Sequence, residues 1–120
     1  MTDGSRPDRV GEEFREILAE EIPRLKDPRV GFVTVTEVRV TPDLRKARVF
    51  YTVLGEESEH RATAAGLRSA SGHLRQVLGH QVRLKFLPDL EFHEDVGLTR
   101  AERVDELLRK AHREGDDASA

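Results

Sequence analysis

The N-terminal part of the chain carries apolar residues at the spacing of an α-helix. Three or four positions separate successive members of one apolar face, which consists of Val10, Phe14, Ile17 and Leu18. Asp8 is expected to cap this helix, because its carboxylate can accept hydrogen bonds from the backbone N–H groups of the first turn. Pro23 disfavours helical geometry in the residue before it. The pattern therefore predicts a first helix over residues 8–22.

The next two segments have the character of β-strands. Residues 32–40 are mostly β-branched, and residues 45–54 alternate apolar and polar side chains. The short turn between them predicts antiparallel pairing. In the first strand the apolar positions change parity partway along, so we expect a β-bulge whose position the pattern does not fix. Tyr51 falls on the apolar face of the second strand and is expected to pack in the core rather than to stack on a base.

A second helical pattern runs through a group of small residues. Its apolar positions again follow helical spacing and are Leu67, Ala70, Leu74, Val77 and Leu78. The run passes through Ser69–Gly72, where glycine costs about 1 kcal/mol relative to alanine in a helix interior. Gly/Ser pairs are a recognised cause of kinks, and small side chains let another backbone approach closely. We therefore expect a kinked helix–kink–helix unit that starts at a Ser58 cap and ends at Gly79.

The C-terminal third predicts a strand and a final helix. Apolar residues at 82, 84 and 86 alternate with Arg83 and Lys85, as in a half-buried strand, and Leu90 and Phe92 resume this parity after Pro88. Thr99 is expected to cap a last helix, whose apolar face consists of Val104, Leu107, Leu108 and Ala111. The resulting order, α-β-β-α-α-β-α, is typical of an α+β fold in which helices cover one face of a three-stranded sheet.

Length and composition favour a single domain outside the membrane. The chain has 120 residues and no cysteine, which excludes disulfides and thiolate metal sites. The predicted elements define one domain over residues 8–112, and the polar segments 1–7 and 113–120 are expected to be disordered. No apolar run approaches the ~20 residues of a membrane span, and no secretory signal is visible, so we expect a cytoplasmic protein.

The distribution of charge is more informative than its total of −3. Residues 60–88 contain no acidic side chain and five basic ones, namely Arg61, Arg68, Arg75, Arg83 and Lys85. The first three recur every seven residues, so on a straight helix they form one row about 130° from the apolar stripe. Guanidinium groups suit phosphate because they can donate two parallel hydrogen bonds. This block is either a surface for a polyanion or a solvated helix face, and the charges at Arg45, Lys46 and Arg48 either extend it or serve solubility.

No arrangement of residues points to catalysis. The sequence lacks a nucleophile motif and a phosphate-binding P-loop. His73 and His80 are seven residues apart and can share a helix flank, but no third metal ligand is evident. The histidines are therefore interpreted as surface residues, and we expect no enzyme activity, no metal and no cofactor.

Six segments resemble the ribosome-binding factor A family: residues 27–38, 41–44, 47–50, 70–75, 84–92 and 105–108. The resemblance as a whole covers about residues 8–112. The resemblance implies a type II KH-like fold, in which Ala70-Ser71-Gly72 replaces the GxxG loop of other KH domains. Near residues 96–101 the sequence departs from the family, which more often has an acidic, serine-containing turn and a glycine where Ala101 stands.

The resemblance also implies a function. Members of this family bind the immature small (30S) ribosomal subunit, assist late maturation and 5′-end processing of 16S rRNA, and matter for growth in the cold. The expected partners are 16S rRNA and ribosomal proteins, and the free protein is expected to be a monomer. The implied RNA surface combines the small residues and the basic residues around them: Arg45, Lys46, Arg48, Arg68, Ser69, Ala70, Ser71, Gly72, His73, Arg75, Arg83 and Lys85. The alternative is a protein-interaction module whose basic face binds an acidic protein.

Overall fold

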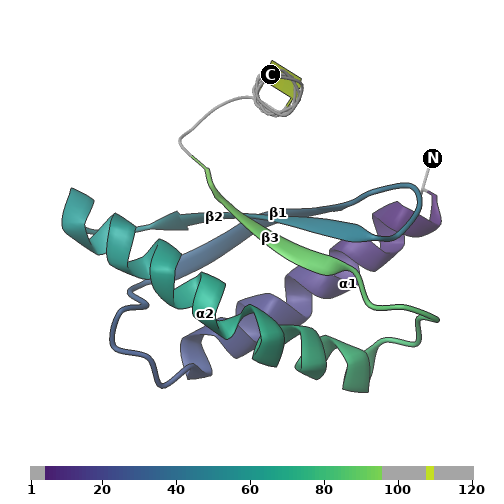
Figure 1. The fold of residues 1–120 in the computed structure, drawn as a ribbon, viewed down its shortest axis with the longest axis horizontal. Helices are drawn as coiled ribbons and strands as arrows, with labels where there is room; N and C mark the ends of the chain where they lie inside the picture. Colours follow the sequence, from purple (N-terminus) through teal and green to yellow (C-terminus); the bar gives the residue numbers. More distant parts are fainter. Residues whose placement is uncertain (1–4, 96–107, 110–120) are drawn as a thin grey trace, which may run out of the picture.

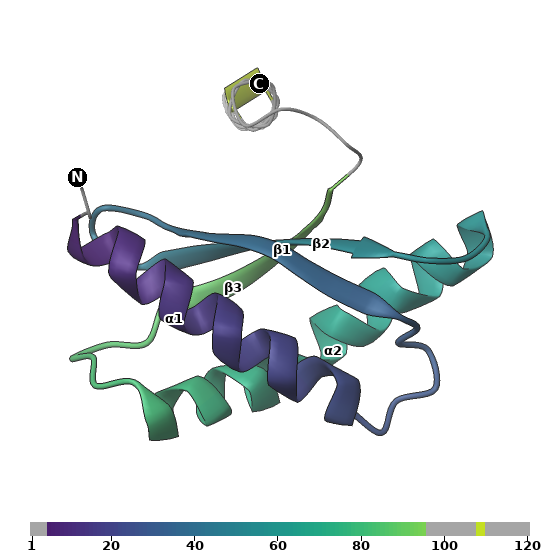
Figure 2. The ribbon, with the colours of Figure 1, turned by 180° about the vertical axis from the view of Figure 1, so that it is seen from behind.

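In the described part of the chain, a three-stranded sheet carries helices α1 and α2 on one face (Figures 1 and 2). This computed structural model describes residues 5–95 and 108–109. Its elements are α1 (Arg6–Glu21), the 3₁₀ helix η1 (Ile22–Arg24), β1 (Val33–Val40), β2 (Lys46–Val53), α2 (Glu57–Gln81) and β3 (Asp89–Glu94). The strand order is β1-β2-β3, with β1 antiparallel and β3 parallel to β2. The predicted α+β class and three-stranded sheet are confirmed, and α1 and α2 lie on one face of the sheet.

Parallel pairing of β2 and β3 requires a crossover, which α2 provides. The crossover places α2 and α1 side by side beneath the sheet (Figure 2). No helix in the described ranges is long and apolar enough to cross a membrane. The helix predicted from Thr99 onwards lies outside the described residues, except that Leu108 and Arg109 are helical.

Helix α1 begins two residues before its predicted start. Ser5 caps it, with its Oγ accepting a hydrogen bond from the backbone N–H of Asp8 at 3.4 Å, so the prediction of Asp8 as the cap is wrong. Pro7 fits the first turn because a helix leaves the N–H groups there without partners. The predicted apolar face is buried at Val10, Phe14 and Leu18.

The expected β-bulge lies at Thr36. The register of β1 against β2 shifts between Val35 and Glu37, which turns the later valines of β1 back toward the helices. The Thr36 hydroxyl donates a hydrogen bond to the carbonyl oxygen of Phe50 at 3.2 Å. The bulge thus explains why apolar residues occupy both parities of one strand that has one buried face.

The core lies between the sheet and the two helices. Its largest fully buried side chain is Tyr51, which is 2% exposed, as predicted for a packing residue. Phe50 points to the face of the sheet opposite α1 and α2 but is also only 2% exposed, and its ring stacks on His93 with centroids 5.6 Å apart. Aromatic packing therefore occurs on both faces of β2.

Helix α2 is continuous from Glu57 to Gln81. The prediction of two helices separated at Ser69–Gly72 is therefore wrong, whereas a bend in the axis stays a prediction. Three apolar residues predicted for the helix face are buried against the sheet: Leu67, Leu74 and Leu78. Their burial outweighs the low helix propensity of Gly72, because a buried leucine contributes about 1.5–3 kcal/mol.

The ends of α2 also differ from the prediction. Glu56, not Ser58, is the N-cap and forms a capping box with Glu59. The C-cap is Val82, not Gly79. Gly79 instead lies against Leu87, because a Cβ atom at this glycine would be 2.7 Å from a Leu87 methyl carbon. Glycine here permits close packing of the following loop rather than ending the helix.

The predicted strand over residues 82–86 is an irregular loop, and β3 begins at Asp89. The alternation in the sequence has another cause. Val82 is buried and Leu84 packs against the core, whereas Arg83, Lys85 and Phe86 are exposed. Val82 and Leu84 thus hold the loop against the core at alternate positions, although the loop does not pair as a strand. The predicted inward parity of Leu90 and Phe92 is correct, since both pack against the core from β3.

Candidate nucleic-acid interface

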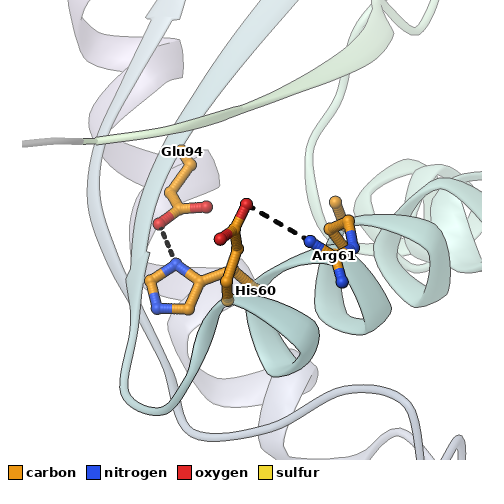
Figure 3. Close-up of a pocket in the computed structure, with 5 residues that line it drawn as sticks. His60, Arg61 and Glu94 are labelled. Atoms are coloured by element: carbon orange, nitrogen blue, oxygen red, sulfur yellow. Dashed lines mark hydrogen bonds and ion pairs between the residues drawn. The ribbon is translucent and has the colours of Figure 1, made fainter.

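Two arginines of the row, Arg61 and Arg75, lie near the two ends of β3. Arg61 and its neighbour His60 lie near Glu94 at the end of β3 (Figure 3). Arg75 reaches Asp89 at the start of the same strand. Helix α2 therefore runs antiparallel to β3. Arg68 lies between Arg61 and Arg75 along the helix.

The guanidinium group of Arg75 forms hydrogen bonds within the protein. Its Nε donates to the carbonyl oxygen of Pro88 at 3.1 Å, and its Nη2 donates to that of Leu87 at 2.8 Å. The Asp89 carboxylate lies 3.7 Å from Nε. These contacts hold the end of the loop against α2. Arg75 thus helps to position the loop, while its assignment to an RNA surface stays a prediction.

Arg61 and Arg68 differ in their surroundings. Arg61 forms an exposed ion pair with Glu57 at 3.3 Å, a type of contact that contributes little stability. Arg68 is exposed and makes no ion pair or hydrogen bond with its side chain in the described ranges. Burial raises the pKa of the Tyr51 hydroxyl, Glu94 raises it further, and the Arg68 guanidinium opposes both. Arg68 is thus the member of the row whose hydrogen-bond donors are available to a ligand.

An open stretch of helix surface adjoins Arg68. Ser69, Gly72 and His73 are exposed, whereas Ala70 packs partly against the core. A Cβ atom at Gly72 would meet nothing within 4 Å. The fold does not need a glycine at this position for packing, and the bare backbone is accessible to another chain.

The loop after α2 brings in a second group of cations. Arg83 and Lys85 are exposed, and the Arg45 carbonyl oxygen accepts a hydrogen bond from the backbone N–H of Asp89 at 2.9 Å. This bond ties the β1–β2 hairpin to the loop. Arg45, Arg75, Lys85 and the unpredicted Arg6 consequently line one hollow. No signal in the sequence pointed to Arg6, which lies before the predicted first helix.

Lys46 and Arg48 do not join this surface. Both belong to the face of β2 opposite the helices, and both contact Glu91 of β3, at 3.0 and 3.4 Å. Burial alone would raise the pKa of the Glu91 carboxyl, but hydrogen bonds from Lys46 and His93, with the charge of Arg48, hold it below its usual value. The predicted set of RNA-binding residues is thus divided between the two faces of the sheet.

His60 and Glu94 form a link that the sequence did not indicate (Figure 3). The Nδ1 of His60 contacts the Glu94 carboxylate, and Nε2 lies 3.0 Å from the carbonyl oxygen of Gly55. Only the imidazolium can donate from both nitrogens, so the hydrogen bond with Glu94 and that with Gly55 raise the pKa of His60. In the part of the chain that the structure describes, no three histidines or carboxylates are grouped to hold a metal ion.

These features define a small α+β protein with a basic helix-and-loop surface. The sequence model described as "Ribosome-binding factor A" matches residues 6–108. The ribosome-binding factor A of Geobacter sulfurreducens is 42% identical over 111 residues, which cover 92% of this chain and 94% of that relative. The crystal structure of ribosome-binding factor A from Thermus thermophilus superimposes with a TM-score of 0.69 at 30% identity, covering 78% of this chain and 99% of that one. The chain belongs to the ribosome-binding factor A family.

A further similar structure records a complex. It is a homology model of the Thermus thermophilus ribosome-binding factor A, fitted into a cryo-EM map of a 30S complex. It matches with a TM-score of 0.62 at 32% identity, covering 72% of this chain and 92% of that one.

Proposed function

We propose that this protein binds the immature 30S ribosomal subunit in the cytoplasm and assists late maturation of 16S rRNA, including processing of its 5′ end, with a role in growth in the cold. Membership of the family and the 30S complex of a similar protein support this proposal. The protein acts by binding RNA and not by catalysing a reaction. The observation that carries the proposal is Arg68, exposed and without an ion pair among the described residues, beside the open backbone at Gly72.

The interface that we propose centres on α2. Arg68 contacts phosphate, and the exposed small residues beside it let the RNA backbone approach the helix. Arg83, Lys85 and Arg45 extend the positive surface from the loop and the hairpin. Lys46 and Arg48 contribute less, because Glu91 already balances part of their charge.

The same segment supports a KH-like arrangement. The Ser71 hydroxyl donates to the carbonyl oxygen of Arg68 at 2.9 Å. Such a bond from serine to the preceding turn often bends a helix. We propose that Ala70-Ser71-Gly72 bends α2 and takes the place of the GxxG loop of other KH domains. The bend turns the exposed backbone toward the bound RNA.

Sedimentation with purified immature 30S subunits tests the proposed function. We expect R68E to reduce the fraction of protein that co-sediments by about tenfold, because one phosphate contact becomes a repulsion. The matched control is R9E, which makes the same charge change at an exposed position of α1. Circular dichroism verifies that both variants fold. Wild-type co-sedimentation of R68E, or failure of the unmodified protein to co-sediment with subunits, would contradict the proposal.

A further inference from the structure

We propose that the hollow between the β1–β2 hairpin and the loop after α2 binds one unpaired RNA nucleotide. Arg45 and Lys85 hold its phosphate, and its base stacks on Phe86. We call this site the hairpin–loop hollow. The inference rests on the proposed function in that RNA is the ligand. It goes further by naming a position where a base, and not only the backbone, is bound.

The hollow has more basic than acidic side chains in its lining. Arg6, Arg45 and Lys85 line it, and none of their side chains pairs with a carboxylate in that part of the chain. Two carboxylates also line the hollow, but both are engaged. Asp43 accepts from the Thr41 hydroxyl at 2.7 Å and from the backbone N–H of Arg45 at 3.1 Å, and these bonds, with the nearby charge of Arg45, lower its pKa.

The second carboxylate, that of Asp89, lies 3.7 Å from Arg75, whose guanidinium also holds the loop carbonyls. Four cationic side chains thus face two carboxylates that are already bound to the protein. An anion entering the hollow meets a surplus of hydrogen-bond donors, and phosphate suits a fork of guanidinium and ammonium groups.

An exposed aromatic ring stands at the rim. Phe86 is 71% exposed, and Lys85 Nζ lies 5.7 Å from the centre of its ring. Tyr51, the aromatic residue that the sequence excluded from base stacking, is buried, whereas the ring of Phe86 is open to a base. A cation beside an exposed ring is the combination by which proteins bind single-stranded nucleic acid. Phe32 is also exposed, at 83%, but the groove beside it is lined by uncharged residues.

Both ends of the loop that borders the hollow are anchored to the rest of the fold. Val82 and Pro88 are buried at either end of the loop, and Arg75 fixes the carbonyl groups of its last residues. Across the hollow, Leu44 adopts a φ of 60°, the left-handed conformation that closes the hairpin turn. Pre-organisation of this kind lowers the entropic cost of binding.

The geometry selects unpaired RNA. A duplex presents its phosphates, but its bases are stacked on one another and cannot reach Phe86 without being extruded. A loop, a bulge or a free end already exposes base faces. The ligand is therefore a single-stranded segment, and stacking on an aromatic ring implies little preference for a particular base.

Fluorescence tests this site directly, because the chain contains no tryptophan. The F86W variant carries a single reporter in the hollow, and F32W is the matched control at another highly exposed phenylalanine. The probes are an adenosine hexanucleotide RNA and a hexanucleotide RNA duplex. We expect the single strand to quench the fluorescence of F86W and not that of F32W, and the duplex to quench neither. Unchanged F86W fluorescence while the single strand binds, measured by anisotropy, or equal quenching by the duplex, would overturn the proposal.

Affinity gives a second readout. We expect F86A to bind the hexanucleotide about tenfold more weakly and F32A to bind it as the unmodified protein does. Equal affinities for F86A and F32A would count against the site. Failure of this site is distinguishable from failure of the proposed function. A protein that co-sediments with immature subunits while F86W does not respond to RNA retains the function and loses the nucleotide site.

Discussion

At the scale of single residues, Arg75 determines where the loop after α2 lies. Replacing it by alanine leaves the carbonyl oxygens of Leu87 and Pro88 without their donor. We expect R75A to lower the free energy of unfolding by about 1–2 kcal/mol, allowing for partial exposure to water. R68A is the matched control and should change it by less than about 0.5 kcal/mol, because its side chain has no such partner among the described residues. Urea unfolding measures both, and equal midpoints for the two variants would show that these hydrogen bonds do not stabilise the fold.

His60 predicts a dependence of stability on pH. Its pKa in the folded protein is raised, first by the hydrogen bond with Glu94 and then by that with Gly55 and the nearby Glu59. Because this pKa is raised, the contact of His60 with Glu94 stabilises the fold fully when the pH is below the pKa of the unfolded state, about 6.5. The stabilisation is lost as the pH rises through the pKa of the folded state. We expect the difference in unfolding free energy between the unmodified protein and H60Q to be largest near pH 5.5 and to shrink toward pH 8.5. A difference that is constant over this range contradicts the assignment of the imidazolium.

At the scale of elements, two glycines in helices make opposite predictions. A Cβ atom at Gly11 of α1 would lie 2.5 Å from the Val38 carbonyl oxygen of β1, so helix and strand would have to separate. We expect G11A to destabilise the protein by about 1–3 kcal/mol. Gly72 of α2 has no neighbour within 4 Å, and G72A should stabilise by up to about 1 kcal/mol. Thermal unfolding of the two variants tests this contrast, and melting temperatures shifted in the same direction would refute it.

A substitution at Gly72 should change stability and binding in opposite directions. If RNA approaches the bare backbone of α2, a methyl group at this position interferes with binding while the helix becomes more stable. We therefore expect G72A to co-sediment less with immature subunits than the unmodified protein despite a higher melting temperature. Undiminished co-sedimentation would show that the backbone at Gly72 is not part of the interface.

Sequence periodicity predicted those elements whose pattern is set by one buried face. Helix α1, both strands of the hairpin and the inward parity of Leu90 and Phe92 follow from local spacing. The helix N-caps were predicted less well. Ser5 and Glu56 cap the helices, but the nearby Asp8 and Ser58 have side chains equally able to do so. The loop over residues 82–88 was mistaken for a strand because its burial depends on packing against Gly79 and on hydrogen bonds from Arg75. Such contacts come from distant parts of the chain and leave no periodic signal.

At the scale of the whole molecule, ion pairing divides the basic residues between two surfaces. On the face of the sheet opposite α1 and α2, Glu91 balances Lys46 and Arg48. On α2 and the adjoining loop, Arg68, Arg83 and Lys85 have no acidic partner in the described ranges. The acid-free stretch of sequence identified this second surface. The sequence did not predict that Arg6 lines the hollow or that Arg75 binds the loop carbonyl groups, because both depend on the three-dimensional arrangement.

The central claim is that Arg68 contacts rRNA phosphate from the exposed face of α2. The measurement that tests it most directly is the affinity for immature 30S subunits as a function of KCl concentration. Each phosphate contact contributes about 0.7–0.9 to the slope of log affinity against log salt. We expect a clearly negative slope for the unmodified protein, a slope shallower by about one for R68A, and no change for R9A. A flat response of the unmodified protein, or an identical slope for R68A, would contradict the account.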